Sequence, residues 1–368
     1  WLEAHNPNEP LNFLDHHIKC GNAIVGLAHF KELENGIADE AFKTLPSDEK
    51  DVAATFRNKN KAERKTKGQL GIYDLTSAED NLSEITRRFS QFEEMPEGTP
   101  EEISAKAEAY NKLTTGKGWY RLKQLADLQV AQFFISKTDE NKEKITTDAK
   151  YRTYLNSGAQ IQDRGAAMAK AAEKRFFHWF LEFPEVFSQG GFDCILGNPP
   201  YLGGKKISGK YGDSFLNYVF SCYDESGGLT DLVIYFLRRI YSLNKTNCYS
   251  ALISTNSLYQ GDSRESGLEH LINNDNLSII MGIRSLKWPG QAQTYVALIS
   301  IKKGQVTNEI IELDNKKVEF IGSYFVPFKI KPPHTLKSNY RKSFIGSVVN
   351  GSGFIITEEE AKKIIQKY

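Results

Sequence analysis

Apolar residues follow two different periods along this chain. In the second half, short runs of apolar and β-branched residues end at glycine or polar residues and predict buried strands at 192–196, 249–254, 277–283 and 294–301. A longer apolar stretch at 231–243 predicts a helix between the first two strands. This alternation of helix and strand predicts an α/β fold with a doubly wound sheet.

Residues 31–175 have helical periodicity instead. Apolar residues recur there at intervals of three or four and predict helices at 48–67, 77–94, 101–113, 122–134 and 164–180. Acidic and basic side chains balance across the segment, so we interpret its charged runs as solvated helix faces. These patterns predict a large helical insertion within the α/β domain.

The predicted strand at 192–196 leads into an unusual turn, Asn198-Pro199-Pro200-Tyr201. The two prolines restrict the backbone, so the Pro199 carbonyl and the Asn198 side-chain oxygen can converge as two acceptors on one amino group. Such a site suits the exocyclic amine of a nucleobase, a poor nucleophile that aimed acceptors can activate. Tyr201 can stack against a base taken out of its helix. The alternative is a proline-rich turn without a catalytic role.

This Asn-Pro-Pro-Tyr sequence behind a strand resembles the catalytic motif of DNA adenine methyltransferases. Those enzymes methylate the exocyclic amine with S-adenosylmethionine. Further blocks are similar, in order, to the large bifunctional restriction-modification and phage-defence methyltransferases, at residues 11–26, 230–243, 249–258, 287–303 and 342–354. The resemblance implies a Rossmann-like methyltransferase sheet, flipping of the target adenine, double-stranded DNA as substrate, and restriction or defence subunits as candidate partners.

The resemblance also implies which residues contact the cofactor and the target base. Asn22 matches the position that contacts the adenine of the cofactor, where many relatives have aspartate; the alternative is a polar turn after a strand. Phe236 matches a ring that packs against the same adenine, or else it is a core aromatic. Trp288 matches the aromatic that closes on the target base opposite Tyr201. The full set of predicted cofactor contacts is Gly21, Asn22, Ala23, Pro200 and Phe236.

Three lysines follow the catalytic turn, and we expect them to contact DNA phosphates. Lys205, Lys206 and Lys210 lie in a stretch that has no acidic residue between Asp193 and Asp213. The sequence from Gly204 to Tyr211 nearly matches a phosphate-binding loop. Its last residue is a tyrosine, which cannot supply the small hydroxyl that holds magnesium, so a nucleotide hydrolase is the weaker hypothesis.

Composition sets limits on partners and location. The net charge of the 368 residues is only +1, which excludes a uniformly basic surface. No run of 18 apolar residues and no signal pattern occurs, so we expect a cytoplasmic protein without a membrane partner.

The four cysteines are widely spaced, and we expect reduced thiols in apolar surroundings. Adjacent residues of a helix or strand point to different sides, so we expect His16 and His17 to be poor joint ligands and predict no metal site.

We expect four parts: 1–30, the first part of the methyltransferase domain; 31–175, the helical insertion; 176–303, the catalytic part; and 304–368, the start of a target recognition region. Residues 309–320 predict two strands joined by an Asp-Asn turn. From Phe320 to Thr357 no acidic residue occurs in 38 positions, which suits a nucleic-acid surface or a new core. A helix is expected from Glu358.

The chain begins at Trp1, and no glycine turn behind a strand precedes Gly21, so we expect a fragment whose sheet is truncated on its N-terminal side.

The first prediction concerns catalysis by this chain alone. We expect it to transfer no methyl group to duplex DNA, because the resemblance implies that one wall of the cofactor pocket comes from the expected missing part. The alternative function is a catalytically silent DNA-binding fragment. An assay with radiolabelled S-adenosylmethionine and purified chain checks the prediction, and methylated DNA would contradict it.

Overall fold

The structure is a computed structural model, and it describes residues 10–66, 76–157, 161, 164–288 and 295–330, together with 337–339, 342, 361–362 and 365. The chain divides into two compact units, Trp1–Phe328 and Lys329–Tyr368. Everything below concerns the first unit. The helix expected from Glu358 and most of the acid-free segment lie outside the described residues. None of the described helices is long and apolar enough to cross a lipid bilayer.

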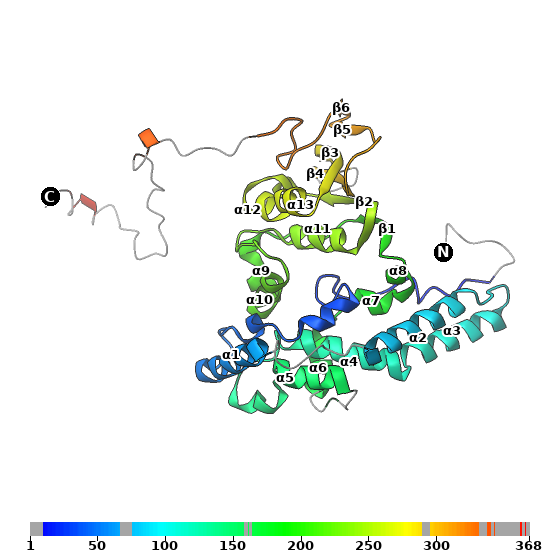
Figure 1. Ribbon diagram of the computed structural model, residues 1–368. Coiled ribbons are helices and arrows are strands. Elements are labelled where there is room, and N and C mark those ends of the chain that lie inside the picture. Colours follow the sequence, from blue (N-terminus) through cyan, green and yellow to red (C-terminus); the bar gives the residue numbers. More distant parts are fainter. Residues whose placement is uncertain are drawn as a thin grey trace. The chain divides into compact units, whose positions relative to one another are not determined.

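A mixed six-stranded sheet forms one end of this unit (Figure 1). Its strands are ordered β1 (Phe192–Gly197), β2 (Asn244–Ser254), β4 (Tyr295–Lys303), β3 (Leu277–Lys287), β5 (Ile311–Leu313) and β6 (Lys316–Val318). Strands β1 and β2 are parallel, and β4 is antiparallel to both of its neighbours, β2 and β3. Consequently β1, β2 and β3 all end at the same edge of the sheet. The predicted α/β class is confirmed.

The short hairpin at the far side of the sheet agrees with the sequence pattern. Strands β5 and β6 pair in antiparallel fashion around Asp314 and Asn315. Both residues have positive φ angles, 49° and 62°, as a tight hairpin turn requires. The predicted strand, Asp-Asn turn and strand are therefore confirmed.

One face of the sheet is covered by helices. Helix α11 (Leu232–Leu243), the π-helical turn η7 (Glu265–Glu269) and α13 (His270–Asn274) contribute to a buried cluster with Ile279 of β3 and Ile299 of β4. Between them lie η6 (Asn256–Tyr259) and α12 (Gly261–Arg264). The periodic apolar residues of α11 are therefore the side chains that hold this helix against the strands.

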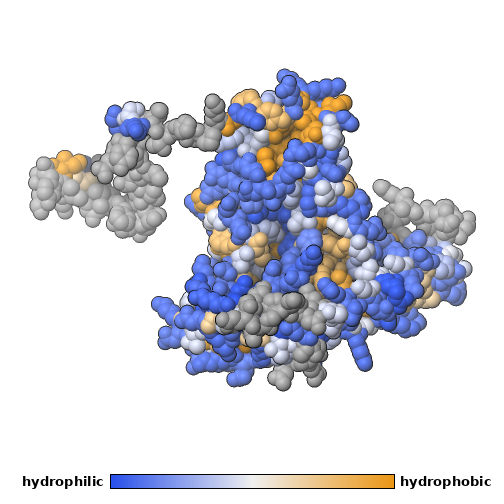
Figure 2. Space-filling view, in the orientation of Figure 1, coloured by the Kyte–Doolittle hydropathy of each residue, from blue (hydrophilic) through white to orange (hydrophobic). Residues whose placement is uncertain are grey.

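The opposite face of the sheet is apolar and open in the described part of the chain. Leu196 of β1 is 77% exposed, and it lies beside Ala251, Ile253, Met281 and Leu298 in a shallow hollow of about 340 Å³. Figure 2 shows hydrophobic surface among the strands at the top of the view. The hollow is lined by strand residues and Asn198 alone, so this face is apolar up to the Asn198–Tyr201 turn.

Residues 30–174 form the predicted helical segment. Its elements are η1 (Phe30–Asn35), η2 (Asp39–Phe42), α1 (Lys50–Lys65), α2 (Thr76–Glu93), α3 (Pro100–Thr114), α4 (Lys117–Ala131), η4 (Asp139–Lys144), α5 (Asp148–Ser157) and α6 (Arg164–Lys174). Helix α3 begins with a capping box between Thr99 and Glu102. Helix α5 was not predicted. The helix predicted at 164–180 ends at Lys174, because Arg175 adopts a positive φ of 56° and Phe176 bridges to Asn22.

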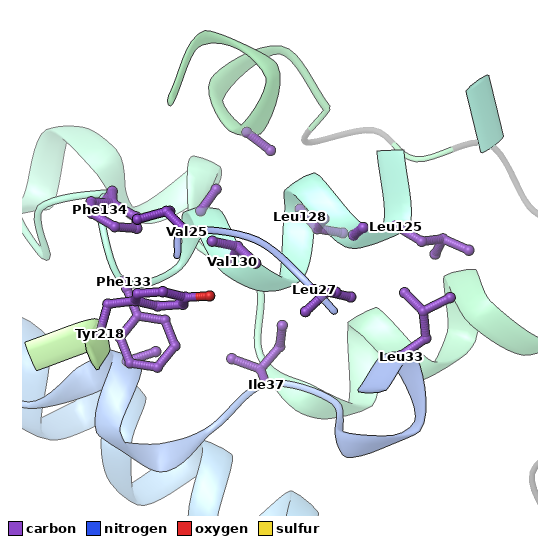
Figure 3. Packing of buried hydrophobic residues seen from close by; sticks show 14 of the residues in the cluster. Val25, Leu27, Leu33, Ile37, Leu125, Leu128, Val130, Phe133, Phe134 and Tyr218 are labelled. Atoms are coloured by element: carbon purple, nitrogen blue, oxygen red, sulfur yellow. The ribbon is translucent and has the colours of Figure 1, made fainter. Parts of the chain in front are cut away.

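The helical segment shares one core with the chain on both sides of it. Leu125 and Leu128 of α4 belong to the same buried cluster as Val25 and Leu27 from the first segment (Figure 3). Tyr218, from α10 (Asp213–Cys222), completes the cluster from the catalytic part. The segment therefore folds against the rest of the unit.

The aromatic run before β1 is mainly core. Phe177 and Phe180 are buried, and α7 (Trp179–Glu182) and α8 (Pro184–Ser188) bring further rings around Phe192.

The prediction of apolar surroundings for the cysteines is wrong in most cases. Cys20, Cys194 and Cys222 are exposed, and Cys248 is half-buried.

A buried histidine joins three parts of the sequence. The Leu27 backbone N–H donates to Nδ1 of His178 (3.1 Å), and Nε2–H of His178 donates to Oδ1 of Asp127 (3.0 Å). His178 is 2% exposed and Asp127 is fully buried. Because Nδ1 accepts, the proton must be on Nε2. Lys123, one turn earlier on α4, pairs with the other oxygen of Asp127.

This network yields a stability prediction. We expect His178→Ala to lower the free energy of unfolding by at least about 2 kcal/mol, because it leaves one oxygen of the buried Asp127 carboxylate and the buried Leu27 N–H without a partner. Chemical denaturation monitored by circular dichroism measures the loss. The control is Lys170→Ala, which removes a partly exposed ion pair with Glu173 and should cost under about 1 kcal/mol. Equal losses in both variants would contradict a central role for His178.

Candidate functional site

The turn after β1 places the predicted catalytic residues at the carboxyl edge of the sheet. Asn198, Pro200 and Tyr201 are exposed, while Pro199 is buried. The hydroxyl of Tyr201 donates a hydrogen bond to Oδ1 of Asn198. Partial burial raises the pKa of Tyr201 above its usual value, which keeps the hydroxyl protonated and able to donate. Asn198 thus presents an acceptor oxygen that a neighbouring side chain already occupies.

The turn is anchored to the beginning of α11. The Leu202 N–H donates to Oδ1 of Asp231 (3.3 Å), and the Leu232 N–H donates to the Leu202 carbonyl (2.9 Å). Asp231 also caps α11 by accepting from the Val233 N–H (3.1 Å), and its own N–H donates to Oγ of Ser263 (2.9 Å). Sequence reasoning missed this positioning residue. An aspartate directly before an apolar helix is a capping signal that could have identified it.

The glycine-rich stretch after the turn has a steric explanation. A Cβ atom on Gly204 would lie 2.6 Å from the carbonyl oxygen of Gly228, so only glycine allows this close approach. Lys205 and Lys206, in η5 (Gly204–Lys206), are exposed, as is Lys210 in α9 (Ile207–Tyr211). The three lysines are therefore available to a ligand outside the protein, and Lys210 also lines the pocket described next.

One pocket brings together all five residues predicted to contact the cofactor. Its volume is about 450 Å³, within the usual range for small-molecule sites. The predicted residues in its wall are Gly21, Asn22, Ala23, Pro200 and Phe236. Residues that sequence reasoning did not single out, Glu173, Lys174 and Arg175 at the end of α6, also line it. The pocket thus has an aromatic wall, an amide and both signs of charge, which fits a charged adenosine derivative.

Close packing against Phe177 explains why the first segment passes through this pocket. A Cβ on Gly21 would lie 2.4 Å from the Phe177 ring. Gly26 has a φ of 139°, and a Cβ there would lie 2.1 Å from the Phe177 carbonyl oxygen. The Asn22 N–H donates to the Arg175 carbonyl (2.7 Å), and the Phe177 N–H donates to the Val25 carbonyl (2.8 Å). These contacts hold the segment along the chain that leads into α7.

The Asn22 side chain is partly engaged with its own turn. Its Oδ1 accepts a long hydrogen bond from the Ile24 N–H (3.4 Å). Phe236 is half-buried, whereas the residues on either side of it in α11 are buried. Its ring is therefore both a core contact and part of the pocket wall.

Trp288 is on the same edge of the sheet as Asn198 but lies apart from it. It directly follows β3, which continues for five residues beyond Gly282, the β3 residue that lies level with Gly197 at the end of β1. Three strand spacings separate β1 from β3, which amounts to about 14 Å. Trp288 is half-buried, and residues 289–294, which follow it, are outside the described part of the chain. Trp288 therefore follows a strand that is not adjacent to β1 in the sheet.

The expectation that His16 and His17 point apart is wrong. The chain forms a tight turn here, with the His17 N–H donating to the Leu14 carbonyl (2.9 Å), so the helix and strand geometries do not apply. The two imidazole centroids are 3.8 Å apart. Burial, together with the neighbouring His17 and Lys106, lowers the pKa of His16 to about 4.

Comparison with known protein families matches a part of the chain that contains several of these site residues. The model of the family described as Eco57I restriction-modification methylase matches residues 79–287, more than half of the chain. The chain belongs to the Eco57I restriction-modification methylase family. The matched range includes Asn198, Tyr201 and Phe236, and it ends one residue before Trp288. Gly21, Asn22 and Ala23 precede it.

The individual relatives have low sequence identity to this chain. DNA methyltransferase A of Bacillus subtilis (strain 168) is 28% identical over 205 residues, which are 51% of this chain and 23% of that protein. Among solved structures, the type IIL restriction-modification enzyme MmeI in complex with DNA is similar at 15% identity and a TM-score of 0.35, over 78% of this chain and 45% of that one. The chain thus spans less than half the length of either relative.

Proposed function

We propose that this member of the Eco57I restriction-modification methylase family acts in the S-adenosylmethionine-dependent methylation of the adenine amino group in DNA. The observation that carries the proposal is the pocket beside the Asn198–Tyr201 turn. Its wall contains all five residues that the resemblance assigns to the cofactor, although Asn22 and Pro200 are 178 positions apart. Pro200 belongs to both the turn and the pocket, so the donor and the acceptor of the methyl group would meet there.

The turn supplies acceptors for the amine of a flipped adenine. Oδ1 of Asn198 and the carbonyl of Pro199 each accept one amine proton, which draws the nitrogen lone pair out of conjugation with the ring. The Tyr201 hydroxyl has to release Oδ1 of Asn198 before the amine can bind there. The Tyr201 ring then stacks on the base. S-adenosylmethionine, when bound, supplies the methyl group.

The opposite wall of the base site is assigned to Trp288. Trp288 follows β3, which lies three strand spacings, or about 14 Å, from β1 across the sheet, so this assignment rests on the resemblance.

Calorimetric titration with S-adenosylmethionine tests the cofactor pocket. We expect Phe236→Ala to weaken binding by about tenfold or more, because a ring stacked on a base contributes about 1–3 kcal/mol. Phe187→Ala is the control, since Phe187 is also a half-buried phenylalanine but does not line this pocket. Equal affinity in the two variants would contradict the pocket assignment. No binding of S-adenosylmethionine by this chain would favour the catalytically silent alternative.

The amine acceptor is tested at Asn198 in the complete enzyme. We expect Asn198→Ala to slow methyl transfer roughly 10²–10³-fold, since losing one preorganised polar contact costs about 2.7–4 kcal/mol in the transition state. Affinity for cofactor and DNA should change little, because Asp231 still holds the turn. Single-turnover methylation measures the rate, and a wild-type rate would disprove the role of Asn198.

Tyr201 separates stacking from hydrogen bonding. We expect Tyr201→Ala to weaken capture of the flipped base by about 1–3 kcal/mol. Tyr201→Phe should be nearly silent, because it keeps the ring and removes only a hydroxyl that has to leave Asn198 in any case. Fluorescence of 2-aminopurine at the target position reports flipping. A loss in Tyr201→Phe as large as that in Tyr201→Ala would show that stacking is not the role of this residue.

The proposed DNA contacts of Lys205, Lys206 and Lys210 predict a change in salt dependence. Replacing all three by alanine should reduce the slope of log affinity against log salt by up to about three. Lys59, Lys61 and Lys65, exposed on α1, are the control set, and their replacement should leave the slope unchanged. Fluorescence anisotropy with a DNA duplex at several salt concentrations gives both slopes. The same slope in the two triple variants would place the loop lysines away from DNA.

A further inference from the structure

Two histidines and a glutamate converge at the point where the first segment meets the end of α2. His16 and His17 come from the turn that begins at Leu14, and Glu93 is the last residue of α2. One ligand atom of each residue lies within 4.8 Å of the ligand atoms of the other two. Nε2 of His16 is 3.6 Å from Oε1 of Glu93. Imidazole and carboxylate groups in this number match the ligands of many zinc sites.

The His16 ring is buried without a hydrogen-bond partner in the described part of the chain. His16 is 5% exposed, and its Nδ1 contacts no donor or acceptor there. The ring stacks on Phe13, with centroids 5.5 Å apart, and meets the edge of Phe92. Buried polar atoms in folded proteins are almost always satisfied. The unpartnered Nδ1 shows that the polypeptide satisfies the His16 ring only in part, since Nε2 faces Glu93.

The charges around the three residues are compatible with a bound cation. Lys106 and Lys19 approach the site, but each is already paired with a carboxylate. Nζ of Lys106 lies 2.5 Å from Glu97, and Nζ of Lys19 lies 3.2 Å from Glu182. The carboxylate of Glu93 is therefore left to balance the charge of an ion.

We propose that His16, His17 and Glu93 bind one Zn²⁺ ion, with a water molecule as the fourth ligand. Around a tetrahedral zinc, ligand atoms lie about 3.4 Å apart, given metal–ligand distances near 2.1 Å. His17 and Glu93 are exposed, so small rotations of their side chains close the remaining distance. This site is independent of the proposed methyltransferase function.

The ion would connect the first segment to the helical insertion. The turn at 14–17 precedes Gly21 by only a few residues, so a bond to Glu93 restrains the chain just before it enters the cofactor pocket. We therefore assign the ion a structural role. Because it binds the folded form, it should raise the unfolding temperature, and by more as the free Zn²⁺ concentration increasingly exceeds the dissociation constant.

Titration of the tag-free, chelator-treated chain with Co²⁺ tests the site. Tetrahedral Co²⁺ absorbs visible light strongly, so we expect a signal that saturates at one ion per chain and disappears when Zn²⁺ is added. His17→Ala and Glu93→Gln should each weaken binding by at least about tenfold. Glu94→Gln is the matched control, since Glu94 is the next residue and is also exposed.

Thermal unfolding gives a second measurement that does not depend on absorption. Zn²⁺ should raise the unfolding temperature of the parent chain and of Glu94→Gln, and it should not raise that of His17→Ala. His17 is exposed, so this variant should fold even if His16→Ala does not. Absence of both the Co²⁺ signal and the Zn²⁺ shift in the parent chain would overturn the proposal. So would equal Co²⁺ affinities in Glu93→Gln and Glu94→Gln.

Discussion

The hydrogen bonds of the buried His178 are the constraint on which the arrangement of this protein depends. One ring accepts from Leu27 and donates to Asp127, so residues up to 151 positions apart are fixed to a single imidazole. Leaving any of these buried polar groups without a hydrogen-bond partner would lower the stability of the fold. The first segment, the helical insertion and the chain before β1 consequently have one mutual position, and the core in Figure 3 forms around it.

The candidate site follows from that position. The first segment can reach the pocket only because Gly21 and Gly26 let it lie against Phe177, the neighbour of His178. On the other side, α11 performs three tasks. Asp231 at its start holds the Asn198–Tyr201 turn, Phe236 faces the pocket, and the buried residues of its opposite face pack on the sheet. One rigid helix thus sets the position of the Asn198–Tyr201 turn relative to Phe236 in the pocket wall.

The same reasoning explains why the turn can be exposed and still be well placed. Asn198 and Tyr201 meet solvent, which a large substrate such as DNA requires. Their backbone is held from behind by Asp231 and by the close approach of Gly204 to Gly228. In the proposed mechanism, Asn198 can then exchange the Tyr201 hydroxyl for an amine without movement of the main chain.

Much of this structure was determined by the sequence alone, because the relevant signals are local. Periodicity predicts α1, α2, α3 and α11, apolar runs predict the strands, and the Asp-Asn pair predicts the hairpin of β5 and β6. The residues of the pocket could be named as well, because their motifs resemble those of a known family.

Other features were decided only by tertiary contacts. The early end of α6 results from the bridge between Phe176 and Asn22, and the pairing of Asp127 with His178 joins residues 51 positions apart. The convergence of His16, His17 and Glu93 requires a turn to dock on a distant helix. The physical reason is that side-chain periodicity reports which face of an element is buried, whereas the partner of a buried polar group depends on which distant segment packs against that face.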